Sequence, residues 1–188
     1  MIRDKYAREI ETILARYPDK RSAILPLLYL VQKEQGYCTE EGIREVADLL
    51  DLDPTAVKSI VGFYTLLYER PVGKYVIQVC NDLSCALRGA DDLVEHACRR
   101  LGVRPGETTP DGLFTLETVK CIAACHRAPV AQVNLEYHEN LTPEAFDALI
   151  ERLRAEGMPS ADGRIPGVVG LKVKHSESEE EGQETTGR

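Results

Sequence analysis

Two close pairs of cysteines constrain this sequence more than any other feature. The first pair is Cys80-Asn-Asp-Leu-Ser-Cys85 and the second is Cys121-Ile-Ala-Ala-Cys125. A long segment separates the pairs, so neither pair encloses a metal centre alone, and the fold must bring one loop against the other. Four converging thiolates suit either a tetrahedral zinc ion or an iron–sulfur cluster, because both accept a soft, anionic shell of four cysteines.

The spacing within each pair favours the cluster over zinc. Structural zinc sites more often use two tight CxxC loops, whereas CxxxxC and CxxxC leave room to wrap a [2Fe-2S] unit. The other two cysteines, Cys38 and Cys98, are interpreted as structural. His126 adjoins Cys125, which would also suit a Rieske-type centre, in which two histidines replace two cysteines on one iron. Four cysteines already complete the shell of ligands, which favours a role for His126 outside the ligand set.

The segments around these cysteines resemble the thioredoxin-like [2Fe-2S] ferredoxins, and among them the small iron–sulfur subunit of NADH:quinone oxidoreductase, respiratory complex I. The resemblance covers roughly residues 1 to 155. It is carried by the CxxxxC pair, Gly62-Phe63-Tyr64, Pro71-Val-Gly-Lys-Tyr75, Pro110-Asp-Gly-Leu-Phe114 and Cys121 to Asn134. One departure is visible, because this family usually has glycine where the chain has Ala123.

The resemblance implies an electron-transfer subunit with one [2Fe-2S] cluster, held by Cys80, Cys85, Cys121 and Cys125. It implies that NADH and FMN bind only a partner flavoprotein, with which this chain forms a heterodimer. Other peripheral-arm subunits of complex I are further expected partners. The expected location is the cytoplasm, peripheral to the inner membrane through the complex.

Three alternatives remain open at this point. Diaphorase modules of NAD-linked hydrogenases and formate dehydrogenases use very similar small subunits, so the same chemistry fits a different complex. A protein-interaction domain with a structural zinc ion and no redox role would use the same four cysteines. A thiol–disulfide oxidoreductase is disfavoured, because the sequence has no CxxC motif.

The predicted fold class combines an N-terminal helical bundle, residues 1–72, with a thioredoxin-like [2Fe-2S] domain of the α/β or α+β type, residues 73–155. Residues 156–188 are expected to be a partly flexible, acidic C-terminal extension. In the bundle, apolar residues recur at helical spacing, and helix caps are predicted at Ser22, at Thr39 and at Asp53-Pro54.

The second domain is predicted to begin with a β-rich run from Lys74 to Val79 that leads into Cys80. A helix over residues 90–101 follows, then strands over 113–119 and 130–135, and a last helix after Thr142-Pro143. Cys85 is expected just before a helix. This order is compatible with a thioredoxin-like sheet that has helices on both sides.

Charge and hydropathy exclude several classes of function. The formal net charge is −8, which argues against a nucleic-acid footprint, since that needs clustered Lys and Arg. No apolar run is long enough to span a membrane. The sequence also contains no GxGxxG or P-loop motif. The aromatic-rich end of the bundle, Phe63-Tyr64 with Leu66-Leu67-Tyr68, is the predicted anchor for the flavoprotein.

Overall fold

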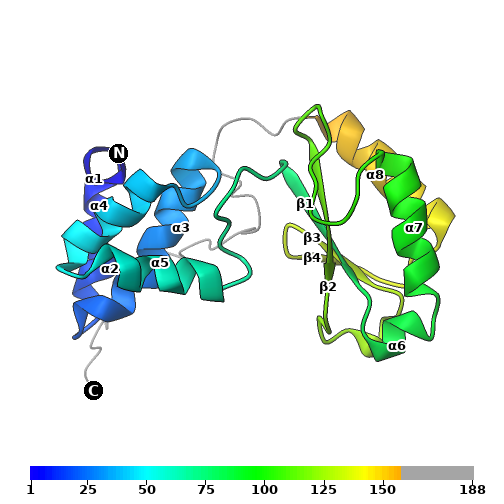
Figure 1. Cartoon of the computed structure of the whole chain (residues 1–188), viewed down its shortest axis with the longest axis horizontal. Helices are drawn as coiled ribbons and strands as arrows, with labels where there is room; N and C mark the ends of the chain where they lie inside the picture. The colour runs from blue at the N-terminus through cyan, green and yellow to red at the C-terminus, as the bar shows by residue number, and fades with distance from the viewer. Residues whose placement is uncertain (158–188) are drawn as a thin grey trace, which may run out of the picture.

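The computed structural model describes residues 1–157. The predicted extension over 156–188 therefore lies almost entirely outside the described residues. Figure 1 shows two groups of elements joined by a connecting segment: helices from the first part of the chain, and a β-sheet with helices from the second. Their buried apolar side chains form separate clusters, one in the first group and two in the second.

The first group contains five α-helices and one 3₁₀-helix. Their bounds are α1 Ile2–Lys5, α2 Ala7–Ala15, η1 Lys20–Ala23, α3 Ile24–Gln35, α4 Glu40–Leu50 and α5 Pro54–Phe63. Leu27, Leu28 and Val31 of α3 are fully buried in the cluster that these helices share. Apolar side chains on one face of each helix thus create a core without contributions from the sheet.

Two of the three predicted helix caps are confirmed. The Thr39 hydroxyl accepts a hydrogen bond from the Gly42 amide at the start of α4, and the Asp53 carboxylate accepts one from Thr55 at the start of α5. The prediction for Ser22 is wrong, because that residue lies inside η1, and α3 begins at Ile24 without a side-chain cap. The turn of 3₁₀-helix before α3 already engages the amides that a cap would satisfy.

The second group is built on a mixed four-stranded sheet of order β2-β1-β3-β4. The strands are β1 Tyr75–Cys80, β2 Phe114–Val119, β3 Ala131–Val133 and β4 Glu136–His138. β1 and β2 are parallel, whereas β3 pairs antiparallel with both β1 and β4. A mixed sheet with helices packed on it belongs to the α/β or α+β class that the sequence predicts.

The predicted strand over 130–135 is confirmed only as β3, and its last two residues instead form the turn of a tight hairpin with β4. Asn134 and Leu135 have φ of 47° and 70°, and they join β3 to β4 as a two-residue loop. Positive φ at both loop residues is the geometry of a type I′ turn, which usually carries Asn-Gly. Leucine in the second position gives no such sequence signal, so β4 was missed.

Helices α7, Ala90–Leu101, and α8, Pro143–Glu156, cover the same face of the sheet (Figure 1). One buried cluster unites alternate β1 residues, Tyr75, Ile77 and Val79, with the inner faces of both helices. His96 of α7 lies 2.9 Å from Asp147 of α8 (Nε2 to Oδ1), which joins the two helices directly. The prediction of helices on both sides of the sheet is therefore wrong for the described residues.

The other face of β1 carries Val76, Gln78 and Cys80, and polar side chains tie β1 to the neighbouring strands. The Asn134 amide oxygen accepts from Val76 N–H at 2.9 Å, and its NH₂ group donates to the Lys74 carbonyl at 2.8 Å. Gln78 donates to Glu117 across the parallel pair at 2.9 Å. These bonds satisfy buried polar groups that would otherwise destabilise the sheet.

The predicted aromatic-rich anchor is divided between surface and core. Phe63 is 77% exposed and Tyr64 is 39% exposed, whereas Leu67 and Tyr68 are buried. Gln32 of α3 holds the buried part, because its side chain bonds the Leu66 carbonyl and the Tyr68 amide. Only Phe63 and Tyr64 remain available as large contact side chains.

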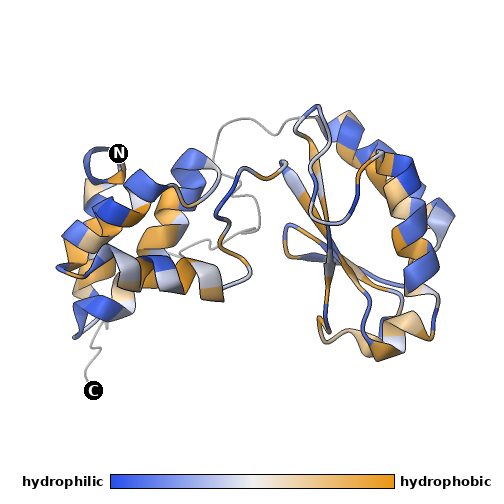
Figure 2. Ribbon diagram, viewed as in Figure 1, coloured by the Kyte–Doolittle hydropathy of each residue, from blue (hydrophilic) through white to orange (hydrophobic). Residues whose placement is uncertain are grey.

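No helix within residues 1–157 is both long enough and apolar enough to cross a membrane. Hydropathy along the ribbon agrees with an amphipathic pattern in the longer helices, where hydrophobic and hydrophilic residues alternate (Figure 2).

Candidate metal centre

Parallel pairing of β1 and β2 brings the two cysteine loops to the same edge of the sheet. Cys80 is the last residue of β1 and lies in register with Val119, the last residue of β2. The Asn81 amide donates to the Val119 carbonyl at 3.1 Å, and the Lys120 ammonium group lies 3.2 Å from the Asn81 side-chain oxygen. Because carboxyl ends of parallel strands meet, both loops begin side by side.

The first loop buries both of its cysteines. Cys80 and Cys85 are 2% and 1% exposed, and they pack in a small cluster with Ala90, Ala124 and Val130. Cys85 precedes α7 as predicted, and it also lies inside a further short helix, α6, Leu83–Ala86, that was not predicted. The short helix turns Cys85 inward, toward the end of β1 that carries Cys80.

The second loop exposes its two cysteines. Cys121 and Cys125 are solvent-exposed, and their Sγ atoms lie 3.5 Å apart. Ala124 between them is buried against the first loop's cluster. One side of the site is therefore closed by packed apolar groups, and the other side faces solvent.

The thiols of the two loops influence each other's protonation. Burial, with a hydrogen bond to Cys80, raises the pKa of the Cys85 thiol to about 11, while a backbone hydrogen bond from Val130 opposes the shift. The pKa of Cys125 is also raised, first by its hydrogen bond with Cys121 and then by the charge of Cys121. A metal centre must therefore displace protons from these thiols when it binds.

The spacing of the exposed sulfur atoms suits two ligands of one tetrahedral metal ion. A tetrahedral ion with metal–sulfur bonds of about 2.3 Å holds each pair of its ligand sulfurs ~3.8 Å apart. Among residues 1–157, no group of three or more His, Cys, Asp or Glu side chains is placed to hold one ion. The pair Cys121–Cys125, at 3.5 Å, is close to this spacing, so it could bind one iron of a [2Fe-2S] cluster or contribute two ligands to a zinc ion.

Cys38 and Cys98 lie outside the two cysteine loops, whereas His126 directly follows Cys125 in the second loop. Cys38 is buried among the N-terminal helices, where burial raises the pKa of its thiol to about 12. Cys98 packs against the core beneath the sheet as a partly buried residue. His126 is exposed in the 3₁₀-helix Cys125–Arg127. The structural interpretation of Cys38 and Cys98 is consistent with these positions.

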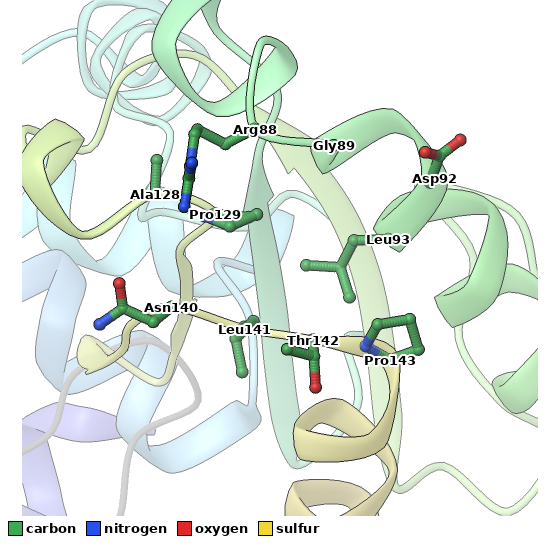
Figure 3. Close-up of a pocket in the computed structure, with 10 residues that line it drawn as sticks. All are labelled: Arg88, Gly89, Asp92, Leu93, Ala128, Pro129, Asn140, Leu141, Thr142 and Pro143. Atoms are coloured by element: carbon green, nitrogen blue, oxygen red, sulfur yellow. The ribbon is translucent and has the colours of Figure 1, made fainter.

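A groove next to the cysteine loops was not predicted from the sequence. It has a volume of about 520 Å³ and is lined by residues from the α6–α7 turn, the Ala128–Pro129 segment and the start of α8. Figure 3 shows the Arg88 side chain extending toward Ala128 and Pro129 at one end of this groove. These residues are far apart in the sequence and carry no shared motif, so no local signal reports the groove.

The residue that departs from the resembled family has an unfavourable backbone conformation. Ala123 has φ of 63°, in the left-handed region, where the Cβ atom of an L-residue is strained by about 1–2 kcal/mol. We expect Ala123→Gly to stabilise the chain by up to ~1 kcal/mol, because the relief of strain exceeds the added freedom of the unfolded state. Thermal or urea unfolding of the metal-free protein measures the effect. A lower stability of the glycine variant would contradict it.

Comparisons with known proteins identify the family. The sequence profile of the thioredoxin-like [2Fe-2S] ferredoxins matches residues 10–154. The chain is 48% identical over 147 residues to an NADH-quinone oxidoreductase subunit of Rhizobium meliloti, a match covering 78% of this chain and 88% of that protein. It is 43% identical over 171 residues to NADH-quinone oxidoreductase subunit 2 of Thermus thermophilus, covering 89% and 94%.

A solved structure shares the fold. The crystal structure of an NAD⁺-reducing [NiFe]-hydrogenase in the H₂-reduced state superposes with a TM-score of 0.61 at 23% identity. That match covers 69% of this chain and 22% of the hydrogenase chain, so it shows similarity of fold alone. Together, the profile match over most of the chain and the high identity to two bacterial relatives place the chain in the thioredoxin-like [2Fe-2S] ferredoxin family, whose cofactor is a [2Fe-2S] cluster.

Proposed function

We propose that this chain is the electron-transfer subunit of an NADH:quinone oxidoreductase, respiratory complex I, and that Cys80, Cys85, Cys121 and Cys125 hold its cluster. The observation that carries the proposal is the meeting of the two cysteine loops at the carboxyl ends of β1 and β2. Support also comes from the relatives, which are named as subunits of NADH-quinone oxidoreductase.

When bound, the cluster supplies one-electron transfer. The chain's own residues set the surroundings of the four sulfurs. Val130 contributes a backbone hydrogen bond to Cys85, and the Ser84 hydroxyl bonds Cys125, which favours the thiolate forms of both residues. The buried sulfurs of Cys80 and Cys85 keep water from one side, while exposed Cys121 and Cys125 leave the other side accessible to a partner.

The proposed electron donor or acceptor is FMN in a partner flavoprotein, which forms a heterodimer with this chain. In this proposal NADH binds only the flavoprotein, and the pair belongs to the peripheral arm, on the cytoplasmic side of the inner membrane. Residues 1–72 are proposed to act as a helical bundle that adds contact surface beside the cluster domain, residues 73–155. Exposed Phe63 and Tyr64 are the candidate anchors on the bundle.

A related complex is the second candidate. The fold is shared with an NAD⁺-reducing hydrogenase, and a small diaphorase subunit of such an enzyme would transfer electrons in the same way. The identities of 48% and 43% to NADH-quinone oxidoreductase subunits favour complex I. Mass spectrometry of proteins that co-purify with the full-length chain separates the two, because only the hydrogenase complex contains a [NiFe] subunit.

Metal analysis tests the cluster directly. Protein purified without oxygen is expected to be red-brown and to contain about two irons and two acid-labile sulfides per chain. Reduction by dithionite should produce a rhombic S = 1/2 signal in electron paramagnetic resonance, because one electron enters a coupled two-iron unit. Colourless protein with stoichiometric zinc would instead establish the interaction domain with a structural zinc ion.

A further inference from the structure

A tyrosine on the last strand of the sheet reaches the second cysteine loop. Tyr137 is the middle residue of β4, and its hydroxyl donates a hydrogen bond of 2.8 Å to the Ile122 carbonyl. The direction of this bond is fixed, because a carbonyl oxygen can only accept. Ile122 directly follows Cys121, so the bond joins β4 to the backbone between the two exposed cysteines.

The register of the strands explains why Tyr137 can reach this loop. Tyr137 pairs with Gln132 of β3, and Gln132 pairs with Gln78 of β1. Paired residues of neighbouring strands point to the same face of a sheet, and Cys80, two residues after Gln78, shares that face. Tyr137 therefore lies on the face that carries Cys80, opposite the face on which α7 and α8 pack.

The bond holds a part of the backbone that is strained. Ala123 follows Ile122 and has φ of 63°, a conformation that alanine keeps only where its surroundings enforce it. The Ile122 carbonyl and the Ala123 N–H belong to one planar peptide unit, so fixing the direction of the carbonyl also fixes that of the N–H. The Tyr137 hydroxyl thus sets the orientation of a peptide unit between Cys121 and Cys125.

Side-chain packing holds little of this loop. Of residues 121–127, only Ala124 is buried, so bonds to the backbone contribute more of the restraint than they do in the core. The chain after β4 supplies another such bond, because the Asn140 amide donates to the Arg127 carbonyl at 2.7 Å. β4 and the residues after it therefore hold the second loop at two points, between its cysteines and just after them.

We propose that Tyr137 is a positioning residue for the cluster, which keeps Cys121 and Cys125 in place through the Ile122 carbonyl. This inference rests on the proposed function, in which both cysteines are ligands on the exposed side of the cluster. Tyr137 acts on the backbone between the ligands rather than on the sulfurs. Its side chain is 46% exposed, so the hydroxyl, more than burial of the ring, accounts for its contribution.

The test compares full-length, cluster-loaded protein with its Tyr137→Phe variant, which loses the hydroxyl and keeps the ring. After reduction by dithionite, the chelator bathophenanthroline should remove iron about 3- to 10-fold faster from the variant, because the loss of one hydrogen bond makes opening of the loop more frequent by that factor. The resonance lines of the reduced cluster should broaden, because Cys121 and Cys125 then adopt a wider range of geometries. Freshly loaded variant and wild-type proteins should contain the same amount of iron.

Tyr6→Phe is the matched control. It also removes a single tyrosine hydroxyl, which bonds the Glu34 carboxylate at 3.0 Å among the N-terminal helices. A hydrogen bond to a charged group is at least as strong as one to a carbonyl, so this change should lower the melting temperature of the metal-free protein at least as much. The rate of iron removal and the resonance spectrum should nevertheless stay as in wild type.

The possible outcomes separate this inference from the proposed function. Iron removal at the wild-type rate with an unchanged spectrum in Tyr137→Phe would overturn the positioning role and leave the proposed function intact. Equal acceleration of iron removal in Tyr6→Phe would show that general stability is responsible, and it would overturn the positioning role as well. A wild-type protein that holds zinc or no [2Fe-2S] cluster would overturn the proposed function, and this inference with it.

Discussion

Replacing Cys80, Cys85, Cys121 or Cys125 with serine is expected to abolish the cluster or change its spectrum in every one of the four variants. Iron–sulfur clusters depend on soft thiolate ligands, and a hydroxyl group is harder and much less acidic. Iron content, visible absorbance and the resonance signal of the reduced protein measure the outcome. An unchanged spectrum in any variant would remove that residue from the ligand set.

The control for this series is Cys98→Ala. Cys98 lies on α7 and packs, partly buried, against the core of the sheet rather than in the cysteine loops, so its removal should leave cluster content and spectrum as in wild type. Cys85→Ser should also lower the stability of the metal-free protein, because it places a hydroxyl group at a position that is 1% exposed. Cys121→Ser should not, since Cys121 is exposed.

The largest expected loss of stability outside the cysteines comes from Gly73→Val, just before β1. A Cβ atom at Gly73 would lie 2.7 Å from the Phe114 carbonyl carbon and 2.8 Å from the Thr115 nitrogen. These are backbone atoms of β2, so they cannot move without disturbing the parallel pair. The Gly73 amide also donates to the Thr115 hydroxyl at 2.6 Å, a bond that any displacement would break. We expect a loss of about 2–3 kcal/mol in the free energy of unfolding.

Urea unfolding of the wild-type and Gly73→Val proteins under the same conditions measures this loss of stability. Gly62→Ala supplies the matched control, because Gly62 lies within α5 and a Cβ atom there has nothing within 4 Å. Alanine in a helix is favoured over glycine by about 0.5–1 kcal/mol, so the control should gain stability. A Gly73→Val protein as stable as wild type would show that β2 can shift away from residue 73.

The positions of the helices in the first half follow largely from local sequence. Thr39 and Asp53 each cap a helix as expected, because a cap is a bond between a side chain and an amide two or three residues away. Gly36 and Gly102 end α3 and α7 in the left-handed conformation, which their lack of a Cβ atom permits. The error at Ser22 arose where a short 3₁₀-helix competed with the cap.

Features that depend on distant residues were missed or wrong. The β3–β4 hairpin was missed because Leu135 adopts positive φ within a turn whose partner strands hold it in place. Helices α7 and α8 pack on the same face of the sheet. The amphipathic pattern of a helix shows which of its sides is buried, but it does not show which face of the sheet that side packs against.

The candidate site shows the same division between local and distant information. The two cysteine pairs and their spacing are properties of the sequence, and they were sufficient to predict a centre with four sulfur ligands. Only the tertiary structure decides that Cys80 and Cys85 are buried and that Cys121 and Cys125 face solvent. Burial and exposure result from packing between elements far apart in the chain, such as the parallel β1–β2 pair. Spacing and capping, by contrast, act between neighbouring residues, which is why the sequence alone determines them.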